Sequence, residues 1–279
     1  MGEIIIDFSE PHIQSLMNYV FDNYRKLDDF CEIESESKDT AKCVECHHRS
    51  YYSGGNPIYE CDNFKRVYLI RFLARQFEQS DFLIKEQVLG EIEDKTDLSA
   101  VSLGGGPAPE ALALMNQLSS CKGDYKLSFD NIDCEASWED TYHDICNQFV
   151  NYIGNVKLKT SFTCYDVTRY VSRKRYDVVF ISWIFSDMRG QNGSNVLQVA
   201  RNVAKPQGCI LLMDYCESAL VARISTLVSE AQGLILLEHK SKQKVHSVVN
   251  FPPEIKNTFS PDMGCDFAYW VLQSSSDDF

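Results

Sequence analysis

Residues 100–118 read AVSLGGGPAPEALALMNQL, and this stretch decides the fold of the second half of the chain. Its first part, Ala100–Leu103, is a short apolar run with the composition of a buried strand. Three glycines follow, and the residues from Pro107 to about Leu118 favour a helix. A strand that leads through a glycine turn into a helix is typical of a parallel sheet covered by helices. The stretch therefore predicts an α/β domain.

The sequence after residue 118 keeps this alternation. Helices are expected at 137–149, 194–204 and 218–231, because each segment has apolar residues at helical spacing. Further strands are expected at 125–133, 157–166, 177–183, 209–214, 234–239 and 266–273. With the strand at 100–103 these make seven. The predicted fold class is α/β, with a seven-stranded, mostly parallel, doubly wound sheet over residues 97–273 and a flexible tail at 274–279.

Residues 1–96 form a helical N-terminal region in this prediction. Ser9 can cap a helix whose apolar positions continue to Tyr24, and Asp62 can cap a second helix. Ser80 is expected to begin a shorter third helix that ends near Ile92. The chain is thus expected to have two parts, the helical region at 1–96 and the α/β domain at 97–273.

Composition and charge limit the classes of function. The 279 residues carry 27 Lys and Arg against 40 Asp and Glu, a formal net charge of −13, so the surface as a whole should repel polyphosphate. The longest apolar stretch, 178–185, is far shorter than the ~18–20 residues that span a bilayer. The first residues lack the features of a secretory signal. We therefore expect a cytoplasmic or nuclear protein without a membrane partner.

The glycine turn is suited to a ligand with an anionic or strongly polar group. Glycines allow a sharp turn and a close approach, and the amides at a helix N-terminus point toward the ligand. A phosphate-binding P-loop would need Gly-Lys followed by Ser or Thr, which the turn lacks. A dinucleotide-binding fingerprint would need a third glycine at position 109, where the chain has Pro109. Neither class fits the turn.

A third class fits better. The segment from Leu103 to Ala108, Leu-Gly-Gly-Gly-Pro-Ala, resembles the first motif of the class I S-adenosylmethionine-dependent methyltransferases. The resemblance extends along residues 98–273 in the order and spacing of the elements, and it implies a final antiparallel pair of strands. It also implies that Gly104, Gly105 and Gly106 bind the methionine and ribose portions of S-adenosylmethionine.

The resemblance carries over to residues at the ends of the next three strands. Asp133, at the end of the second, would accept hydrogen bonds from both ribose hydroxyls, with Glu135 as the alternative. Asp166, after the third, would lie near the adenine. Ser182 and Trp183, at the end of the fourth, would face the cofactor and the substrate.

Two further residues bear on activity. The position two before the first glycine is commonly acidic in the family, but here it is Ser102, which we also expect at the cofactor. A weaker contact to the methionine end, or an inactive descendant that binds or senses the cofactor, is therefore the alternative to an active methyltransferase. Asp187, just past the fourth strand, is the candidate catalytic base. A loop carboxylate that caps the next segment is the competing interpretation.

No recognised sequence motif identifies the methyl acceptor. The chain has no Asn/Asp-Pro-Pro-Tyr/Phe after the fourth strand and no Pro-Cys nucleophile pair. N-terminal extensions in this fold class commonly cover the cofactor and help to form the substrate pocket. An added metal module there favours a macromolecule, RNA or protein, over a small metabolite, while the acidic charge disfavours RNA.

The metal module is predicted from a cluster of soft ligands. Cys43, Cys46 and Cys61 place two thiolates at the spacing that wraps one metal ion and a third after a turn-rich loop. His48 would complete a structural zinc site, and the rivals for the fourth position are His47 and Cys31. The other interpretations are a c-type haem attachment, a redox dithiol and free surface cysteines.

Overall fold

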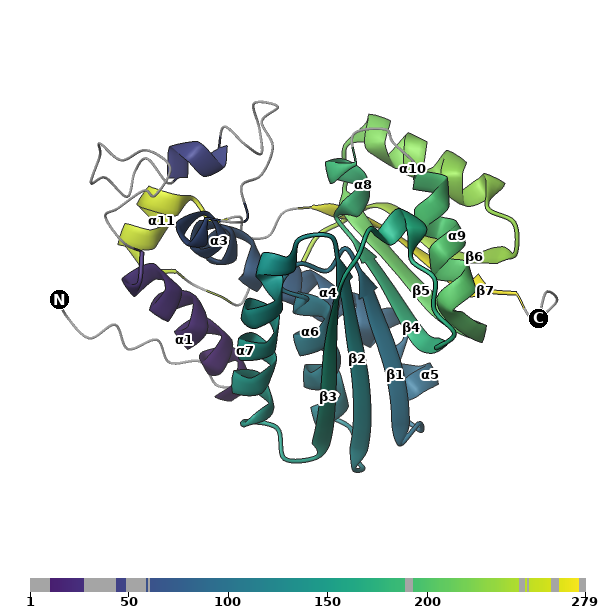
Figure 1. The fold of residues 1–279 in the computed structure, drawn as a ribbon, viewed down its shortest axis with the longest axis horizontal. Helices are drawn as coiled ribbons and strands as arrows, with labels where there is room; N and C mark the ends of the chain where they lie inside the picture. Colours follow the sequence, from purple (N-terminus) through teal and green to yellow (C-terminus); the bar gives the residue numbers. More distant parts are fainter. Residues whose placement is uncertain are drawn as a thin grey trace.

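Seven strands form one sheet in the order β3-β2-β1-β4-β5-β7-β6 (Figure 1). This computed structural model describes residues 11–27, 44–48, 59, 61–188, 193–245, 249, 251–261 and 266–275. The strands are β1 (Asp97–Leu103), β2 (Tyr125–Asp133), β3 (Val156–Cys164), β4 (Tyr176–Ser182), β5 (Ala204–Tyr215), β6 (Leu234–Gln243) and β7 (Phe267–Ser274). All seven lie where the sequence predicts strands, so the predicted sheet is confirmed.

The direction of the strands follows the prediction as well. β1 through β5 pair in parallel, and β7 pairs antiparallel with both β5 and β6. β4 is buried along its whole length, as expected for a central strand with helices on both faces. The chain therefore has an α/β fold with a seven-stranded, mostly parallel sheet.

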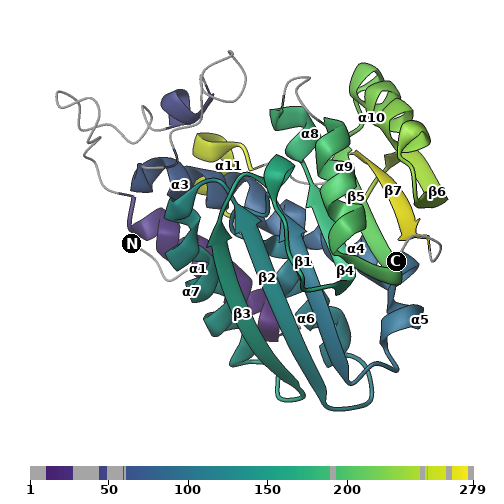
Figure 2. The same ribbon diagram turned by 45° about the vertical axis from the view of Figure 1, so that its right-hand side comes forward.

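Helices cover the two faces unequally (Figures 1 and 2). The N-terminal helices are α1 (Pro11–Arg25), α3 (Asp62–Tyr68), the π-helical segment η1 (Leu69–Leu73), α4 (Ala74–Gln87) and α5 (Leu89–Ile92). The later ones are α6 (Pro109–Ser119), η2 (Ala136–Trp138), α7 (Glu139–Val150), η3 (Val167–Arg169), α8 (Ile184–Asp187), α9 (Gly193–Val203), α10 (Ser218–Glu230) and α11 (Pro253–Phe259). One face packs against α1, α4, α6 and α7, and the other against α9 and α10.

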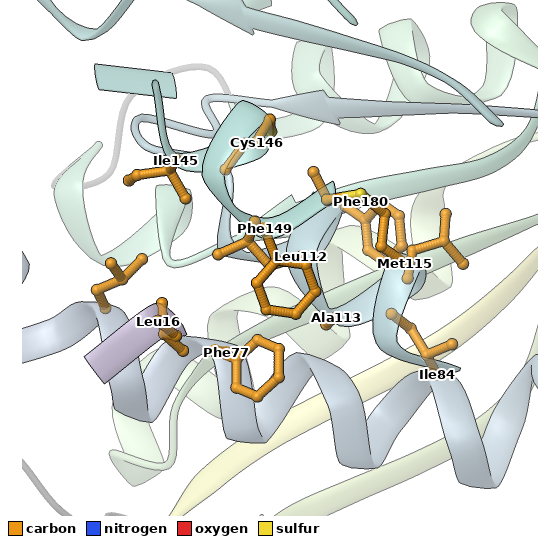
Figure 3. Close-up of a cluster of buried hydrophobic side chains, with 14 of the residues drawn as sticks. Leu16, Phe77, Ile84, Leu112, Ala113, Met115, Ile145, Cys146, Phe149 and Phe180 are labelled. Atoms are coloured by element: carbon orange, nitrogen blue, oxygen red, sulfur yellow. The ribbon is translucent and has the colours of Figure 1, made fainter. Parts of the chain in front are cut away.

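The larger apolar core joins the N-terminal helices to the sheet (Figure 3). Leu16 of α1 and Phe77 of α4 lie against Leu112 of α6 and Phe149 of α7, and the Phe77 and Phe149 rings are 6.0 Å apart. Because these side chains belong to one buried cluster, the helices of region 1–96 cover the sheet rather than forming a separate core. The predicted division at residues 96 and 97 stays a prediction.

The predicted break at Ser80 is wrong. Residues 62–87 form one continuous run through α3, η1 and α4, and Ser80 lies inside α4. Its Oγ donates to the carbonyl of Gln76 at 2.7 Å, one turn earlier. A buried serine can satisfy its hydroxyl in this way without ending the helix.

Two predicted caps are also different in the structure. Cys61 is the N-cap of α3, which places Asp62 at the first helical position. Ser137 has the composition of a cap for the helix expected at 137–149, but the cap is Glu135, whose side chain accepts the amide N–H of Ser137. Ser9, predicted to cap the first helix, lies outside the described residues. Neither difference moves a helix by more than about two residues, the usual uncertainty of helix ends.

One face of the sheet is less covered than predicted. Between β3 and β4 the chain forms only the single turn η3, so no described helix lies over the outer half of β3 on the α9 side. Alternate residues of β3, including Lys157 and Lys159, are exposed. Lysines on an edge strand discourage pairing with another chain.

Within the described residues, no helix is both long and apolar enough to cross a membrane.

Candidate functional site

The site is built at the carboxyl ends of β1 and β4, where the order of the strands reverses direction. From β1 the chain proceeds to β2 on one side, while β4 and β5 lie on the other. Ligands of open α/β sheets bind in the crevice at this point, because the connections to the two sides diverge there. The glycine turn begins directly after β1 and so lies at this position.

The three glycines have the geometry of a ligand cradle. Gly104 and Gly106 have positive φ angles of 70° and 52°, which favour glycine. A Cβ added to Gly105 would collide with Asn131 Oδ1 and lie 2.7 Å from Ser102 Oγ. Ala108 also has a positive φ, 51°, at the N-cap of α6, a strained conformation for an alanine. Larger residues would therefore disturb the turn itself.

Side chains of β2 hold the turn in place. Asn131 Nδ2 donates to the carbonyl of Gly106 at 2.8 Å. Asp133 Oδ2 accepts the Gly106 amide at 2.8 Å, and its Oδ1 accepts the Glu135 amide at 2.9 Å. Burial raises the pKa of Asp133, and these amide hydrogen bonds oppose the rise. Each carboxylate oxygen keeps a lone pair for a ligand hydroxyl.

Asp166 differs from Asp133 in its exposure and in the direction of its pKa shift. It follows β3 and is half exposed, and its carboxylate accepts hydrogen bonds from the Thr168 hydroxyl at 2.7 Å and the Thr168 amide at 2.9 Å. These bonds lower its pKa. Asp133, Glu135 and Asp166 all raise the pKa of Cys134 by their charge, although burial is the larger cause. The carboxylates predicted for the ribose and adenine therefore border one rim of the site.

Four buried polar atoms beside the turn lack a hydrogen bond of normal geometry, although the Ser102 and Ser182 hydroxyls are close enough to Glu110 to lower its pKa. They are Ser102 Oγ on β1, Asn131 Oδ1 on β2, Ser182 Oγ on β4 and Glu110 Oε2 on α6. Native structures leave few buried polar groups unsatisfied. An unsatisfied cluster at the switch point indicates a place where a ligand completes the hydrogen bonds.

The end of β4 supplies the other wall. Trp183 has a positive φ of 57°, and the Arg75 guanidinium lies 6.0 Å from the centre of its ring. Asp187, at the end of α8, is exposed and borders a pocket of about 460 Å³ together with Tyr215 and Arg223. The predicted base is thus open to solvent at the carboxyl end of the sheet, on the β5 side of the turn.

Aromatic rings from η2 and from the N-terminal region lie beside the glycine turn. Trp138 Nε1 is the atom closest to where a Cβ on Gly106 would lie, at 3.7 Å. The Trp138 ring is 5.3 Å from Tyr59 and 5.2 Å from Tyr68. The Asp187 carboxylate contributes to the raised pKa of Tyr68, whose main cause is burial. The rings therefore connect the turn to the region of Asp187.

The helical run through η1 and α4, which follows Tyr68 in the chain, carries two buried cationic side chains. Arg71 lies in the π-helical segment η1, and Arg75 follows one turn later in α4. Arg75 is 1% exposed and lies between the rings of Phe72, Trp183 and Tyr215, at 5.2–6.0 Å from their centres. π-helical segments are often found at functional sites. The two buried guanidinium groups of Arg71 and Arg75 thus lie on the side of this helix that faces the sheet.

The described residues do not support the zinc site. Cys43 and Cys31 lie outside them, and within them no three His, Cys, Asp or Glu side chains form a group that could hold a metal. His47 is fully buried against Phe64 and Phe72, with ring centres 4.8 and 5.6 Å away. Burial, and then the charge of Arg71, lower the pKa of His47 to about 3.

The remaining predicted ligands differ in their exposure to solvent. His48 is exposed, Cys46 is half-buried, and Cys61 is buried at the start of α3. The zinc site therefore stays a prediction from the cysteine spacing.

Several residues of the site were not predicted from the sequence. Asn131, Trp138, Arg75 and Glu110 had no motif of their own, and Asp214 was taken only as the end of a strand. Asp214 accepts the Ser186 amide at 3.1 Å, and burial raises its pKa to about 6. For Glu110 the sequence offers one indication only. It is an acidic residue directly after Pro109, in the first turn of a helix, and such residues normally face solvent.

Comparisons with known proteins agree with this geometry at the level of the fold. No protein-family model matches the sequence, and no curated protein matches it. Among solved structures, the chain is similar to a protein from Listeria monocytogenes named as a candidate class I S-adenosylmethionine-dependent methyltransferase. The identity is 12%, the TM-score 0.52, and the match covers 96% of this chain and 90% of that one.

Two further structures are similar at lower TM-scores. A methyltransferase candidate from Thermoplasma acidophilum has 16% identity and a TM-score of 0.44, covering 65% of this chain and 69% of that one. The magnesium protoporphyrin IX methyltransferase from Synechocystis, solved with bound S-adenosylhomocysteine, has 9% identity and a TM-score of 0.48, covering 85% and 100%. The match to the Listeria monocytogenes structure, whose TM-score is above 0.5, therefore shows that the two chains share a fold.

Proposed function

We propose that the protein is an S-adenosylmethionine-dependent methyltransferase. The observation that carries the proposal is the glycine turn at the switch point, held by Asp133 and surrounded by polar atoms that lack partners. Its position in a methyltransferase-like fold supports the choice of ligand. The carboxylates of Asp133 and Asp166 border the same rim and would receive the ribose and the adenine.

The residues present fit this cofactor. Asn131 and Ser102 pack directly against Gly105, so only a glycine fits there and the turn keeps its tight shape. Asp133 has acceptor capacity left for a diol, and Ser182 and Ser102 present buried hydroxyls. When bound, the cofactor would supply a methyl group on a sulfonium, which is already activated for displacement.

The chain then has to place the acceptor in line with that methyl group. Trp183, which follows β4, and Tyr68, whose ring packs against Trp138, would position the acceptor. Asp187 would take the proton if the acceptor atom is a hydroxyl or a carbon. A neutral amine would need only a hydrogen-bond acceptor, and Asp187 would accept that bond from its N–H.

We further propose that the acceptor is a macromolecule, RNA or protein, and that the protein acts in the cytoplasm or the nucleus. The N-terminal helices that pack on the sheet support this, because they bring the rings of Tyr59 and Tyr68 against Trp138, beside the glycine turn. A tritiated methyl group transferred to total RNA or to total protein would tell the two acceptors apart. Transfer only to a small-molecule extract would contradict this part of the proposal.

A second candidate is a protein that binds the cofactor without methyl transfer. The observation that favours it is the exposure of Asp187, because a catalytic base normally gains its pKa from a partly buried environment. Such a protein would bind S-adenosylmethionine and its demethylated product equally well and would show no transfer to any acceptor.

The test of cofactor binding is calorimetric titration of S-adenosylmethionine and S-adenosylhomocysteine into the full chain. We expect binding in the micromolar range, and we expect Gly106→Arg to abolish it. A Gly106 substituent would approach Trp138 and is strained at a positive φ. Lys157→Ala is the matched control, since Lys157 is exposed on β3 far from the turn. Absence of binding in folded wild-type protein would contradict the proposal.

A further inference from the structure

One half of the sheet has an uncovered face. The connection from β3 to β4 contains only the single turn η3, whereas connections between parallel strands usually contain a helix. Side chains of β2 and β3 that point away from the larger core are therefore open, and no described helix lies in front of them (Figure 1). Parallel sheets are normally covered on both faces, so this bare face needs a physical reason.

Lysines gather in an open groove at the amino end of this face. The groove has a volume of about 470 Å³. The residues that line it include Lys126 on β2, Lys157 and Lys159 on β3, Lys205 at the start of β5, and one carboxylate, that of Asp97. Lys126 and Lys157 are partners in the register of β2 and β3. Four positive charges thus lie close together in a chain whose net charge is −13.

The lysines of β3 differ from the other two in their ion pairs. Lys205 binds Asp177 at 2.7 Å, and Lys126 lies 3.7 Å from Asp97. The two lysines of β3 are exposed and form no ion pair within the part of the chain that the structure describes. Their charges are therefore open to a partner.

A second group of cations borders the same face. Residues 173–175 read Arg-Lys-Arg and lie between η3 and β4. Lys174 Nζ donates to Ser128 Oγ at 2.9 Å and to Asp130 Oδ2 at 2.8 Å, and Ser128 also lines the groove. Arg173 is exposed. The fold thus joins on one surface two groups of cations that are separate in the sequence.

Protection of the sheet edge does not account for this arrangement. Lysines on an edge strand prevent pairing with another chain, which explains Lys157 and Lys159 on β3. Lys126, however, is on β2, which is paired on both sides, and Lys174 is in a loop. Neither of them protects an edge, yet both lie beside the same groove.

The composition of the groove favours phosphate groups over a protein surface. Protein interfaces are depleted of lysine and enriched in aromatic side chains. The residues lining this groove are lysines, serines, leucines and one aspartate. Lysine and serine side chains are common donors to the phosphates of nucleic acids. We propose that this face binds the phosphate backbone of a single-stranded RNA. Of the two macromolecules considered above as acceptors, the groove therefore selects RNA.

The groove lies at the opposite end of the strands from the glycine turn. It is lined by residues at the amino ends of β1, β2 and β3, whereas the turn follows the carboxyl end of β1. The seven residues of β1, at about 3.3 Å each, separate the two places by about 20 Å. RNA held in the groove does not compete with the cofactor, and its binding needs no cofactor. The inference thus goes beyond the proposed function.

The test is fluorescence anisotropy of a labelled, unstructured RNA of about 20 nucleotides with the full chain. We expect binding in the micromolar range at low salt. The logarithm of the binding constant should fall with the logarithm of the salt concentration with a slope of about −3, for four phosphates at about −0.7 each. Saturating S-adenosylhomocysteine should leave the affinity unchanged.

A pair of double variants locates the binding surface. Lys157→Glu combined with Lys159→Glu should weaken RNA binding by about 30-fold or more, because two contacts are lost and two repulsive charges are added. Lys85→Glu combined with Lys244→Glu is the matched control. It changes the net charge equally at two exposed lysines, on α4 and just after β6, and should weaken binding by less than about 3-fold because salt screens distant charges. Thermal unfolding checks that both variants are folded.

The outcomes separate this inference from the proposed function. If the wild-type chain does not bind RNA, or if both double variants lose affinity equally, the docking surface is wrong. If polyglutamate of the same length displaces the RNA as well as unlabelled RNA does, the face takes any polyanion and the assignment to RNA is wrong. If RNA binds in the groove while S-adenosylhomocysteine does not bind at all, the docking surface stands and the proposed function is wrong.

Discussion

A buried carboxyl group lies at each end of the central strands, and the two groups differ in the hydrogen-bond partners that the chain gives them. At the amino end of β4, Asp177 is 7% exposed and is bound by the Lys205 ammonium at 2.7 Å, the Ser99 hydroxyl at 2.8 Å and the Ser99 amide at 3.0 Å. Burial would raise the pKa of Asp177, but these partners outweigh it, and the pKa is lowered.

At the carboxyl end, Glu110 is also buried, but its Oε2 makes no hydrogen bond of normal geometry, and burial raises its pKa to about 7. At the amino end the chain itself thus supplies the partners of the buried carboxylate, as is typical of a structural contact. The carboxyl end leaves polar groups unsatisfied, which costs stability and is retained where a ligand supplies the missing bonds. If the proposed function is right, this difference separates the ligand-binding end of the sheet from the structural one.

The largest expected effect is that removing the charge of Glu110 stabilises the free protein. A raised pKa in the folded state means that stability falls as the pH rises from about 4.5 toward 7. A shift of this size corresponds to about 3 kcal/mol above pH 7. Glu110→Gln should therefore have a higher free energy of unfolding in urea at pH 8 and differ by less than about 1 kcal/mol at pH 5.

A lower stability of Glu110→Gln at pH 8 would mean that the carboxylate has a partner in the free protein. The comparison between the two ends would then fail.

Asp177 should respond in the opposite direction. Asp177→Asn removes the charge that binds Lys205 and Lys95 and should lower the free energy of unfolding by about 2 kcal/mol at pH 7. Because the folded-state pKa is depressed, this contribution is present above about pH 4 and is lost as the pH falls further. Urea unfolding across this range measures it. An unchanged stability at neutral pH would show that the amino end is not completed by these contacts.

Asp133→Asn tests the contact between β2 and the turn. An asparagine offers one acceptor where the carboxylate offers two, so the Gly106 or the Glu135 amide loses its partner. We expect the free energy of unfolding to fall by about 1 kcal/mol and S-adenosylhomocysteine binding to weaken by about 30-fold. Asp166→Asn is the matched control, because Asp166 is half exposed and should change stability by less than about 0.5 kcal/mol. Equal effects of the two variants would contradict the different roles assigned to them.

The smallest effect compares two serines on the same strand. Ser99 donates to Asp177 at 2.8 Å, whereas the buried Ser102 hydroxyl has no partner. Ser99→Ala should lower the free energy of unfolding by about 1 kcal/mol, and Ser102→Ala should change it by less than about 0.5 kcal/mol. Thermal unfolding of both variants distinguishes them, and the reverse order would exclude an incomplete site at the carboxyl end.

The glycine turn shows what the sequence could predict. Strand, glycines and helix are adjacent in the chain, so the turn, its place in the sheet and the seven strands all follow from local patterns. The ends of successive parallel strands meet at one edge, and Asp133 and Asp166 lie close enough together there for both to raise the pKa of Cys134. Their roles at a cofactor stay a prediction.

Residues that join the site from elsewhere could not be predicted in this way. Glu110 is polar and stands in a first helical turn, where local rules place it in solvent, and only the packing of α6 against β1 and β4 buries it. Ser80 had the pattern of a cap, but a hydroxyl bonded to the preceding turn lets the helix continue. The cysteine spacing gave no information on burial, and His47 is packed against aromatic rings.

Hydrogen–deuterium exchange with and without saturating S-adenosylhomocysteine tests the central claim most directly. If the carboxyl end is the ligand site and the amino end is structural, protection should increase in residues 102–110 and 131–138 and stay unchanged in residues 95–99 and 174–177. Unchanged exchange at the glycine turn, or protection confined to the amino ends of the strands, would contradict the account.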